Sequence, residues 1–202
     1  MVAIASTYLS DAPCRLHLDN INKLNKTTSE RNKIGKDQDH VAVERFGFHS
    51  TTCCGYIAHN NEWHDDWVAF YTRCRLQHQM DLIDKETKAE NTRAFKGVDI
   101  KPSLLHGDLW SGNAAEVDDG PVVFDPASFY GHHEFDLAIA GMFGGFSRAF
   151  YDSYHKEVPK ENGFDKRHQL YQLFHHLNHW NHFGTSYKSS SLAIMHGLLE
   201  NS

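Results

Sequence analysis

The chain has 202 residues, which is enough for one hydrophobic core and does not require a second. Its 20 basic and 26 acidic residues give a net charge of −6, and no cluster of lysine and arginine is long enough to mark a nucleic-acid or anionic-membrane surface. We therefore expect no nucleic acid and no membrane among the partners of this protein.

The first residues and the cysteines indicate a cellular compartment. The start, MVAIASTYLS, lacks the basic lead and the apolar run of a signal peptide, and no later window is apolar enough to cross a membrane. The cysteines have neither CxxC spacing nor the density of a disulfide scaffold. We expect reduced, mostly buried thiols in a soluble, cytoplasmic protein. The four cysteines are Cys14, Cys53, Cys54 and Cys74.

The N-terminal half predicts two helices. Residues 14–27 carry Leu16, Ile21 and Leu24 on one helical face, and the polar stretch 27–40 follows as a solvated loop. Residues 64–85 predict a clearer helix, capped by Asp65 or Asp66. Four residues of this second helix recur at the spacing of a buried face, and we expect them in the core. They are Trp67, Phe70, Tyr71 and Cys74.

The pattern then changes to strands and back to helices. Residues 103–107, 113–117 and 121–125 predict strands, with a turn at 118–120 between the last two. A small hairpin therefore lies inside a mainly helical body, and the predicted fold class is α+β. The helices expected beyond the hairpin are residues 133–143, 148–158, 165–183 and 191–199.

The loop "LLHGDLWSGN", residues 104–113, has the spacing of a phosphotransferase catalytic loop. In that pattern the aspartate, here Asp108, accepts the proton of an attacking hydroxyl, and the asparagine, here Asn113, holds a metal. Such a site requires a second metal-binding carboxylate. The sequence offers Asp125, which follows the last strand of the hairpin.

The expected pairing of the hairpin brings Asn113 and Asp125 together. If the hairpin folds about Asp119, then Val117 lies opposite Pro121, and Asn113 lies opposite Asp125 at the open end. Mg²⁺ favours one or two protein oxygens together with phosphate and water. The sequence therefore predicts a Mg²⁺-nucleotide site there, whereas a bulge in the hairpin would change this pairing.

Three neighbouring side chains have supporting interpretations. Asp136 lies at the start of a predicted helix. We expect its carboxylate to be buried or to cap the helix, and to accept hydrogen bonds from backbone N–H groups. We assign structural support to His106 as well. Trp110 is either a core aromatic residue or a ring that stacks on a sugar substrate.

Together these motifs resemble the fructosamine kinases, also called ketosamine 3-kinases, a branch of the protein-kinase-like fold near the aminoglycoside phosphotransferases. The resemblance covers residues 14–199, and "RFGFHSTTCCGYI" at 45–57 is also similar to the animal members. The other segments that carry it are "HGDLWSGN" at 106–113, "FDPASFYGHHEFDLA" at 124–138, "MFGGF" at 142–146 and "LYQLFHHLNHWNHFG" at 170–184.

The resemblance implies transfer of the γ-phosphoryl group of ATP to the O3 hydroxyl of a ketosamine, such as ribulosamine or fructosamine on a protein lysine, leading to protein deglycation. It assigns the general base to Asp108 and the Mg²⁺ ligands to Asn113 and Asp125. The implied cofactors are ATP and Mg²⁺, and the implied substrates are glycated proteins or small ketosamines. The segment 124–128 contains "DPA", which stands where protein kinases have DFG.

The glycines before the catalytic loop do not form the expected glycine-rich motif, and no V-A-x-K lysine motif precedes that loop. We therefore expect 14–202 to be a kinase-like C-terminal lobe preceded by a non-domain segment, 1–13, with the N-terminal lobe missing. Because positioning of ATP is most of the catalysis of phosphoryl transfer, we expect this chain to be weakly active or inactive. Apolar surface left by a missing lobe would favour association through that face.

Three alternatives stay open. A pseudokinase-like fragment could act as a binding module, and a kinase of the same fold could use a small aminoglycoside or choline-type alcohol. The third alternative is a zinc site on the helix at 165–183, where histidines recur on one face. It is disfavoured because the HExxH glutamate is absent and the core stripe runs beside these histidines. They are His175, His176, His179 and His182.

Overall fold

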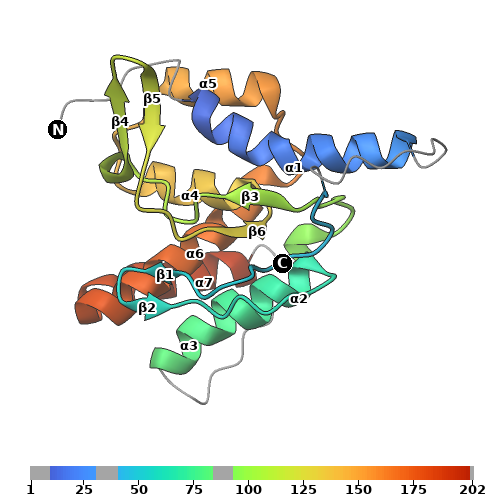
Figure 1. The fold of residues 1–202 in the computed structure, drawn as a ribbon. Coiled ribbons are helices and arrows are strands. Elements are labelled where there is room, and N and C mark those ends of the chain that lie inside the picture. The colour runs from blue at the N-terminus through green and yellow to red at the C-terminus, as the bar shows by residue number, and fades with distance from the viewer. Residues whose placement is uncertain (1–9, 31–40, 84–92, 201–202) are drawn as a thin grey trace.

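The structure is a computed structural model that describes residues 10–30, 41–83 and 93–200. Within these ranges the chain is mostly helical, and its strands form three small antiparallel sheets (Figure 1). The predicted α+β, mostly helical class is thereby confirmed. None of the helices in these ranges combines the length and apolar character that a membrane crossing requires.

The first helix, α1, spans Asp11–Glu30, so part of the predicted loop at 27–40 is helical, and residues 31–40 lie outside the described residues. The buried face of α1 is not the predicted apolar face: His17 and Asn20 are fully buried or nearly so. Asn20 donates to the carbonyl oxygens of Val43 and Pro102 at 2.7 Å each. The polar face is buried because its groups find hydrogen-bond partners, which apolar periodicity does not reveal.

The second predicted helix is present and has three consecutive parts. Asp66 is its N-cap and accepts from the N–H of Ala69 at 2.7 Å, whereas Asp65 accepts from Arg45. The predicted core residues between Trp67 and Cys74 are all buried. The parts are α2 (Trp67–Phe70), a π-helical segment η2 (Tyr71–Gln77) and α3 (His78–Ile83).

Three strand pairs make up the sheets. The candidate catalytic loop that follows Leu105 lies between the first strand of one pair and the hairpin that forms another. The sequence predicted three of these strands and missed the short strands at 53–54, 57–58 and 129–131. The pairs are β1 (Cys53–Cys54) with β2 (Ile57–Ala58), β3 (Ser103–Leu105) with β6 (Phe129–Gly131), and β4 (Ala114–Val117) with β5 (Gly120–Val123).

The predicted register of the β4–β5 hairpin is wrong by one residue. Val117 lies opposite Gly120, because the turn has two residues and not three. Two-residue turns match the right-handed twist of the strands and are the commonest hairpin connections. Asn113 is consequently not opposite Asp125: the N–H of Phe124 donates to the carbonyl oxygen of Asn113 at 3.0 Å.

The C-terminal half is helical as predicted, with ends that differ by a few residues. Gly184 ends the long helix with a positive φ of 74°, a conformation that glycine adopts without strain. The helices are α4 (Glu134–Met142), α5 (Arg148–Glu157), α6 (Phe164–Phe183) and α7 (Lys188–Glu200). Short 3₁₀ turns are η3 (Arg93–Phe95), η4 (Ser111–Asn113) and η5 (Gly184–Tyr187).

Helix α4 lies between the two halves of the molecule. Figure 1 shows α1, α5 and the β4–β5 hairpin on one side of it, and α6, α7 and the β1–β2 sheet on the other. One face of α4 packs in a core around Trp67, to which it contributes Phe135, and the opposite face packs in a core around Phe150, to which it contributes Leu137. The residues at the N-terminus of α4 are therefore held from both sides.

A buried ion pair joins α4 to α6. The guanidinium of Arg167 donates two hydrogen bonds to the carboxylate of Glu134, at 2.8 and 2.7 Å, and a third to the carbonyl of Asn162 at 2.6 Å. Both charged side chains are completely inaccessible to solvent. Two parallel hydrogen bonds between planar groups stabilise the ion pair and also fix the relative orientation of its two side chains.

We expect Arg167→Met to destabilise the fold by about 3–5 kcal/mol, because it leaves the buried carboxylate of Glu134 unpaired. The double variant Glu134→Leu/Arg167→Met removes both charges and should recover most of this loss. Urea unfolding followed by circular dichroism measures both values. Equal destabilisation of the single and double variants would contradict the importance of pairing.

Candidate active site

The catalytic loop begins where β3 ends, and its first turn depends on a glycine. Gly107 has a positive φ of 83°, and a Cβ atom there would overlap the carbonyl oxygen of Ala127. The N–H of Ala127 in turn donates to the carbonyl of His106 at 2.9 Å. The close approach brings the HGD loop against the DPA segment.

Asp136 is completely buried and fixes the backbone of this loop. Its two carboxylate oxygens accept the backbone N–H groups of His106 at 2.7 Å and Gly107 at 2.8 Å. His17 of α1 lies on the same carboxylate, with Nε2 at 2.9 Å from Oδ2. The other ring nitrogen of His17 meets the hydroxyl of Tyr154 at 2.8 Å. One carboxylate therefore ties together α1, α4 and the catalytic loop.

These contacts decide the charge of Asp136. Burial by itself would raise its pKa, but the hydrogen bond and charge of His17, the charge of His106 and the N–H of Gly107 outweigh burial and hold the pKa below its usual value of 3.8. Asp136 is therefore ionised at neutral pH, as an acceptor of three hydrogen bonds must be.

Asp108 and Asn113 form the centre of the loop. The side-chain amide of Asn113 donates to the Oδ2 of Asp108 at 3.1 Å and to its carbonyl at 3.0 Å. Burial raises the pKa of Asp108, the charge of His106 and the Asn113 hydrogen bond lower it, and the charges of Asp136 and Asp125 raise it again. A carboxylate made more basic in this way is better suited to accept a proton from a hydroxyl near neutral pH.

Asp125 reaches the same cluster by a turn of the backbone. It has a φ of 55°, which makes it the only residue other than glycine with a positive φ among those that the structure describes. Such a left-handed conformation is uncommon outside glycine, and aspartate tolerates it better than most residues. The turn brings its carbonyl oxygen to 3.5 Å from Nδ2 of Asn113, while its side chain stays exposed. Asp125 is thus near Asn113 despite the corrected register.

The donor set of this pair suits a small divalent cation. Because Nδ2 of Asn113 faces Asp108, its amide oxygen points away from that carboxylate. An amide oxygen and an exposed carboxylate match the oxygen ligands that Mg²⁺ takes from proteins when phosphate and water supply the rest. Asn113 and Asp125 therefore fit this ion.

His106 connects the loop to the returning strand. Its Nδ1 lies 3.3 Å from the backbone nitrogen of Asp108, and its Nε2 lies 3.0 Å from the carbonyl oxygen of Phe124. These two bonds link the backbone on both sides of the cluster. His106 therefore connects the segment that carries Asp108 to the segment that carries Asp125.

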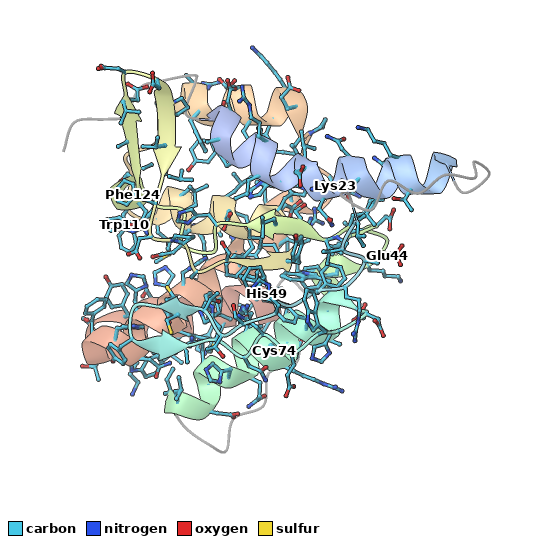
Figure 2. All side chains as sticks on the ribbon, viewed as in Figure 1. Lys23, Glu44, His49, Cys74, Trp110 and Phe124 are labelled. Atoms are coloured by element: carbon cyan, nitrogen blue, oxygen red, sulfur yellow. The ribbon has the colours of Figure 1, made fainter. Side chains whose placement is uncertain are left out.

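Trp110 lies at the surface beside the cluster, at the foot of the β4–β5 hairpin near Phe124 (Figure 2). Its ring packs where a Cβ atom at Gly112 would be, and it meets the ring of Phe143 edge-on at 5.9 Å. With 37% of its surface exposed, it is not a core residue. An exposed ring next to Asp108 is available to stack on a ligand.

Two contacts of the site could not be inferred from the sequence motifs. The thiol of Cys54, on β1, accepts from Nδ2 of Asn178 at 3.3 Å and also interacts with the carboxylate of Asp108. Burial, together with the charge and hydrogen bond of Asp108, raises the pKa of the Cys54 thiol to about 12, so it stays protonated. His17 contacts Asp136 across 119 positions of the sequence. Neither residue belongs to the catalytic-loop pattern, and the family resemblance at 45–57, which includes Cys54, assigned that residue no role.

The histidines considered for zinc have separate environments. The ring of His175 is completely buried and lies 4.9 Å from the ring of Phe135. His179 and His182 each direct Nδ1 at a backbone carbonyl of their own helix, at 2.7 Å. Within the part of the chain that the structure describes, no three histidine, cysteine, aspartate or glutamate side chains are grouped to hold a metal ion.

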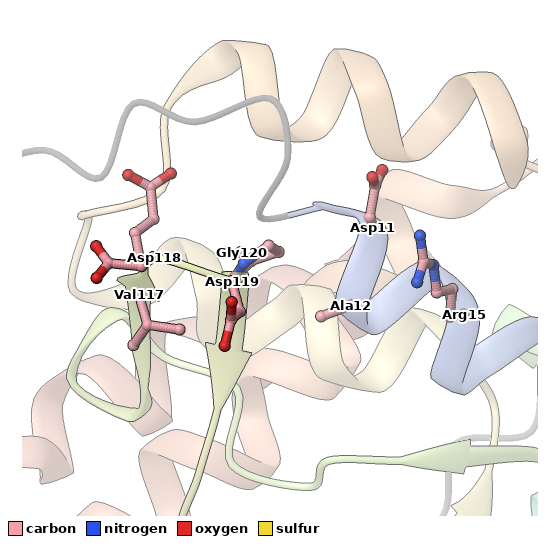
Figure 3. Close-up of a pocket in the computed structure, with 9 residues that line it drawn as sticks. Asp11, Ala12, Arg15, Val117, Asp118, Asp119 and Gly120 are labelled. Carbon is pink, nitrogen blue, oxygen red and sulfur yellow. The ribbon is translucent and has the colours of Figure 1, made fainter.

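A pocket of about 540 Å³ lies at the other end of the hairpin (Figure 3). The hairpin tip, with Asp118 and Asp119, lines one side of it, and Asp11 and Arg15 of α1 line the other. Its carboxylates, with Glu116 among them, outnumber its single guanidinium, so the pocket disfavours phosphate groups.

Comparisons with known proteins agree on one family. A family model described as fructosamine kinase matches residues 16–201. The chain is 48% identical over 208 residues to ketosamine-3-kinase of Mus musculus, covering 96% of this chain and 67% of the mouse protein. It is 38% identical over 186 residues to the chloroplastic protein-ribulosamine 3-kinase of Arabidopsis thaliana, covering 86% of this chain and 55% of the plant protein.

Solved structures show the same relationship. A crystal structure from Haemophilus somnus 129PT, provisionally named a fructosamine-3-kinase, superposes with a TM-score of 0.75 at 26% identity, covering 96% of this chain and 62% of that one. The fold and sequence are therefore those of a kinase. The chain belongs to the fructosamine kinase family. It spans between about half and two-thirds of the length of the proteins it matches.

We expect Asp136→Asn to destabilise the protein at pH 7 by roughly 1–3 kcal/mol, because one acceptor oxygen becomes an NH₂ group that faces a donor. The pKa of Asp136 is lowered in the folded state, so its contribution is present above the unfolded pKa and is lost as pH falls through the folded one. The stability difference between the two proteins should therefore shrink below pH 3.8.

Urea unfolding at pH 7 and at a pH below 3.8 measures this difference. The exposed Asp99→Asn is the matched control and should change stability by less than about 0.5 kcal/mol. Unchanged stability of Asp136→Asn at pH 7 would show that the buried carboxylate does not hold the loop.

Proposed function

We propose that this chain carries the phosphoryl-transfer site of a ketosamine kinase, which uses ATP and Mg²⁺ to phosphorylate the O3 hydroxyl of a ribulosamine or fructosamine on a protein lysine or a small amine. The observation that carries the proposal is the cluster around the Asn113 amide, whose Nδ2 lies 3.1 Å from Oδ2 of Asp108 and 3.5 Å from the carbonyl oxygen of Asp125. The relatives named for ketosamines and ribulosamines support the substrate class.

In this proposal Asp108 is the general base. The sugar hydroxyl attacks the γ-phosphorus of ATP, its proton passes to the carboxylate of Asp108, and the bond between the γ-phosphorus and the bridging oxygen breaks to release ADP. Burial raises the pKa of Asp108 and so favours the proton transfer, while the hydrogen bond from Asn113 holds the carboxylate in place.

Asn113 and Asp125 are the proposed Mg²⁺ ligands. When bound, the ion neutralises the charge on the nucleotide phosphates. The strained backbone at Asp125 supports this role, because left-handed conformations at residues other than glycine cluster at functional sites. His106 and Asp136 act as positioning residues, since they hold the backbone on both sides of the cluster.

Trp110 is the proposed sugar-binding residue. Its exposed ring is next to the loop that carries Asp108, and aromatic rings give sugars an apolar face on which to stack. Phosphorylation of the sugar would start the release of the adduct, and the chain would then act in protein deglycation. The four free cysteines favour a reducing compartment such as the cytoplasm.

The test is transfer of labelled phosphate from ATP to a lysine-borne ribulosamine and fructosamine in the presence of Mg²⁺, together with Mg²⁺-dependent binding of ATP. We expect Asp108→Asn to lower the transfer rate at least about 100-fold, because a general base is removed, while ATP binding is retained. Asp125→Ala should weaken Mg²⁺-dependent ATP binding. Asp119→Asn, at the hairpin tip, is the matched control. It should change neither the rate of phosphate transfer nor Mg²⁺-dependent ATP binding.

The outcomes separate the candidate functions. Failure of both phosphate transfer and Mg²⁺-dependent nucleotide binding would contradict the proposal and leave a pseudokinase-like binding module. Transfer to an aminoglycoside or to choline without transfer to either ketosamine would identify a small-alcohol kinase on the same fold.

A further inference from the structure

A row of aromatic rings leads away from Trp110 along the surface of the molecule. Phe143 lies 5.9 Å from Trp110, and His179 of α6 lies 5.1 Å from Phe143, measured between ring centroids. His179 is followed by Phe183 at 5.6 Å and Tyr187 at 5.0 Å. We call Phe143, His179, Phe183 and Tyr187 the aromatic row. It joins the loop of Asp108 to the C-terminal end of α6.

The aromatic row is open to solvent at its outer end. Phe183 is 65% exposed, whereas the other three rings are partly buried. Tyr56, in the turn between β1 and β2, stands beside this end with its ring 4.2 Å from that of His182. Tyr56 is 71% exposed, so two aromatic side chains are open to solvent at this end. Apolar side chains exposed together can mark a binding site.

The rings are held by regular structure and not by a loose loop. Three of the four belong to α6 and the η5 turn that continues it, and Nδ1 of His179 is fixed by the carbonyl of His175 at 2.7 Å. The hydroxyl of Tyr56 donates to the carbonyl of Asn181 at 2.8 Å and ties the β1–β2 turn to the same helix end. A surface ordered before binding loses less entropy when a ligand arrives.

The ring faces are the groups of this surface that can attract a cation. The segments that supply the row, residues 139–147 and 172–191, contain no aspartate and no glutamate, and their one lysine, Lys188, has its ammonium group 5.9 Å from the ring of Trp180. Burial lowers the pKa of His179, so its ring is neutral at pH 7 and does not repel a positive group. Aromatic faces attract ammonium groups within about 6 Å of the ring centroid. The amine of a ketosamine is such a group, and its alkyl substituent is apolar.

We propose that the aromatic row binds the part of a ketosamine beyond the sugar, namely its ammonium group and the lysyl chain and adjoining peptide that carry it. The inference rests on the proposed function, because it requires the sugar to lie at Asp108 and Trp110. The row is continuous with Trp110, so a substrate whose sugar stacks on that ring directs its amine toward Phe143 and its carrier toward Phe183. The row therefore selects ketosamines on peptides over those on short amines.

The test compares two ligands that differ only in the carrier. Isothermal titration calorimetry without nucleotide measures binding of a fructosamine on the lysine of a blocked tripeptide and of a fructosamine on methylamine. We expect Phe183→Ala and Tyr187→Ala each to weaken binding of the peptide ligand roughly five- to tenfold, through loss of the ring contact with the lysyl chain and the peptide. Binding of the methylamine ligand should change less than about twofold.

The controls separate this inference from the proposed function. Trp110→Ala should weaken both ligands, and Leu82→Ala, an exposed apolar residue on α3, should weaken neither. Equal effects of the Phe183 and Tyr187 variants on the two ligands, or no effect on either, would overturn the aromatic row as a carrier site. Failure of both ligands to bind the unsubstituted chain would overturn the proposed function and this inference with it. Phe183→Leu keeps an apolar side chain and should still weaken the peptide ligand.

Discussion

The carboxylate of Asp136 is completely buried and accepts hydrogen bonds from His17 and from the backbone N–H groups of His106 and Gly107. A buried carboxylate must be fully satisfied, because an unpaired charge there costs several kcal/mol. Its three donors come from α1 and the catalytic loop, and Asp136 itself belongs to α4, which packs between the two cores. The loop can therefore move only if that helix or α1 moves with it.

The position of the candidate catalytic residues follows from this constraint. With Gly107 fixed, Asp108 points to the amide of Asn113, and the left-handed turn at Asp125 brings the third residue to the same amide. The hairpin register does not place these groups face to face. Their proximity depends on two unusual backbone conformations, at Gly107 and Asp125, which the surrounding contacts hold.

The sequence predicted the elements whose cause is local and missed those whose cause is distant. Periodicity and caps located the helices, with Asp65 or Asp66 as the expected N-cap of the second one, and the structure has Asp66 there. The HGD motif identified Asp108 and Asn113 as candidates, and the hairpin that follows it suggested Asp125. The hairpin register was wrong because an Asp-Asp-Gly turn is compatible with either two or three turn residues. The contacts of His17 with Asp136 and of Cys54 with Asp108 were not predictable, since each joins segments far apart in the chain.

The most direct measurement of the proposed site is paramagnetic broadening of backbone amide signals by Mn²⁺ bound with ATP. Mn²⁺ replaces Mg²⁺ at oxygen ligands and broadens only signals of nearby nuclei. If Asn113 and Asp125 hold the metal, their amide signals and that of Phe124 will broaden, and Asp125→Ala will abolish the effect. Broadening confined to the acidic hairpin tip at Asp118 and Asp119, or none at any residue, would contradict a phosphoryl-transfer site at the catalytic loop.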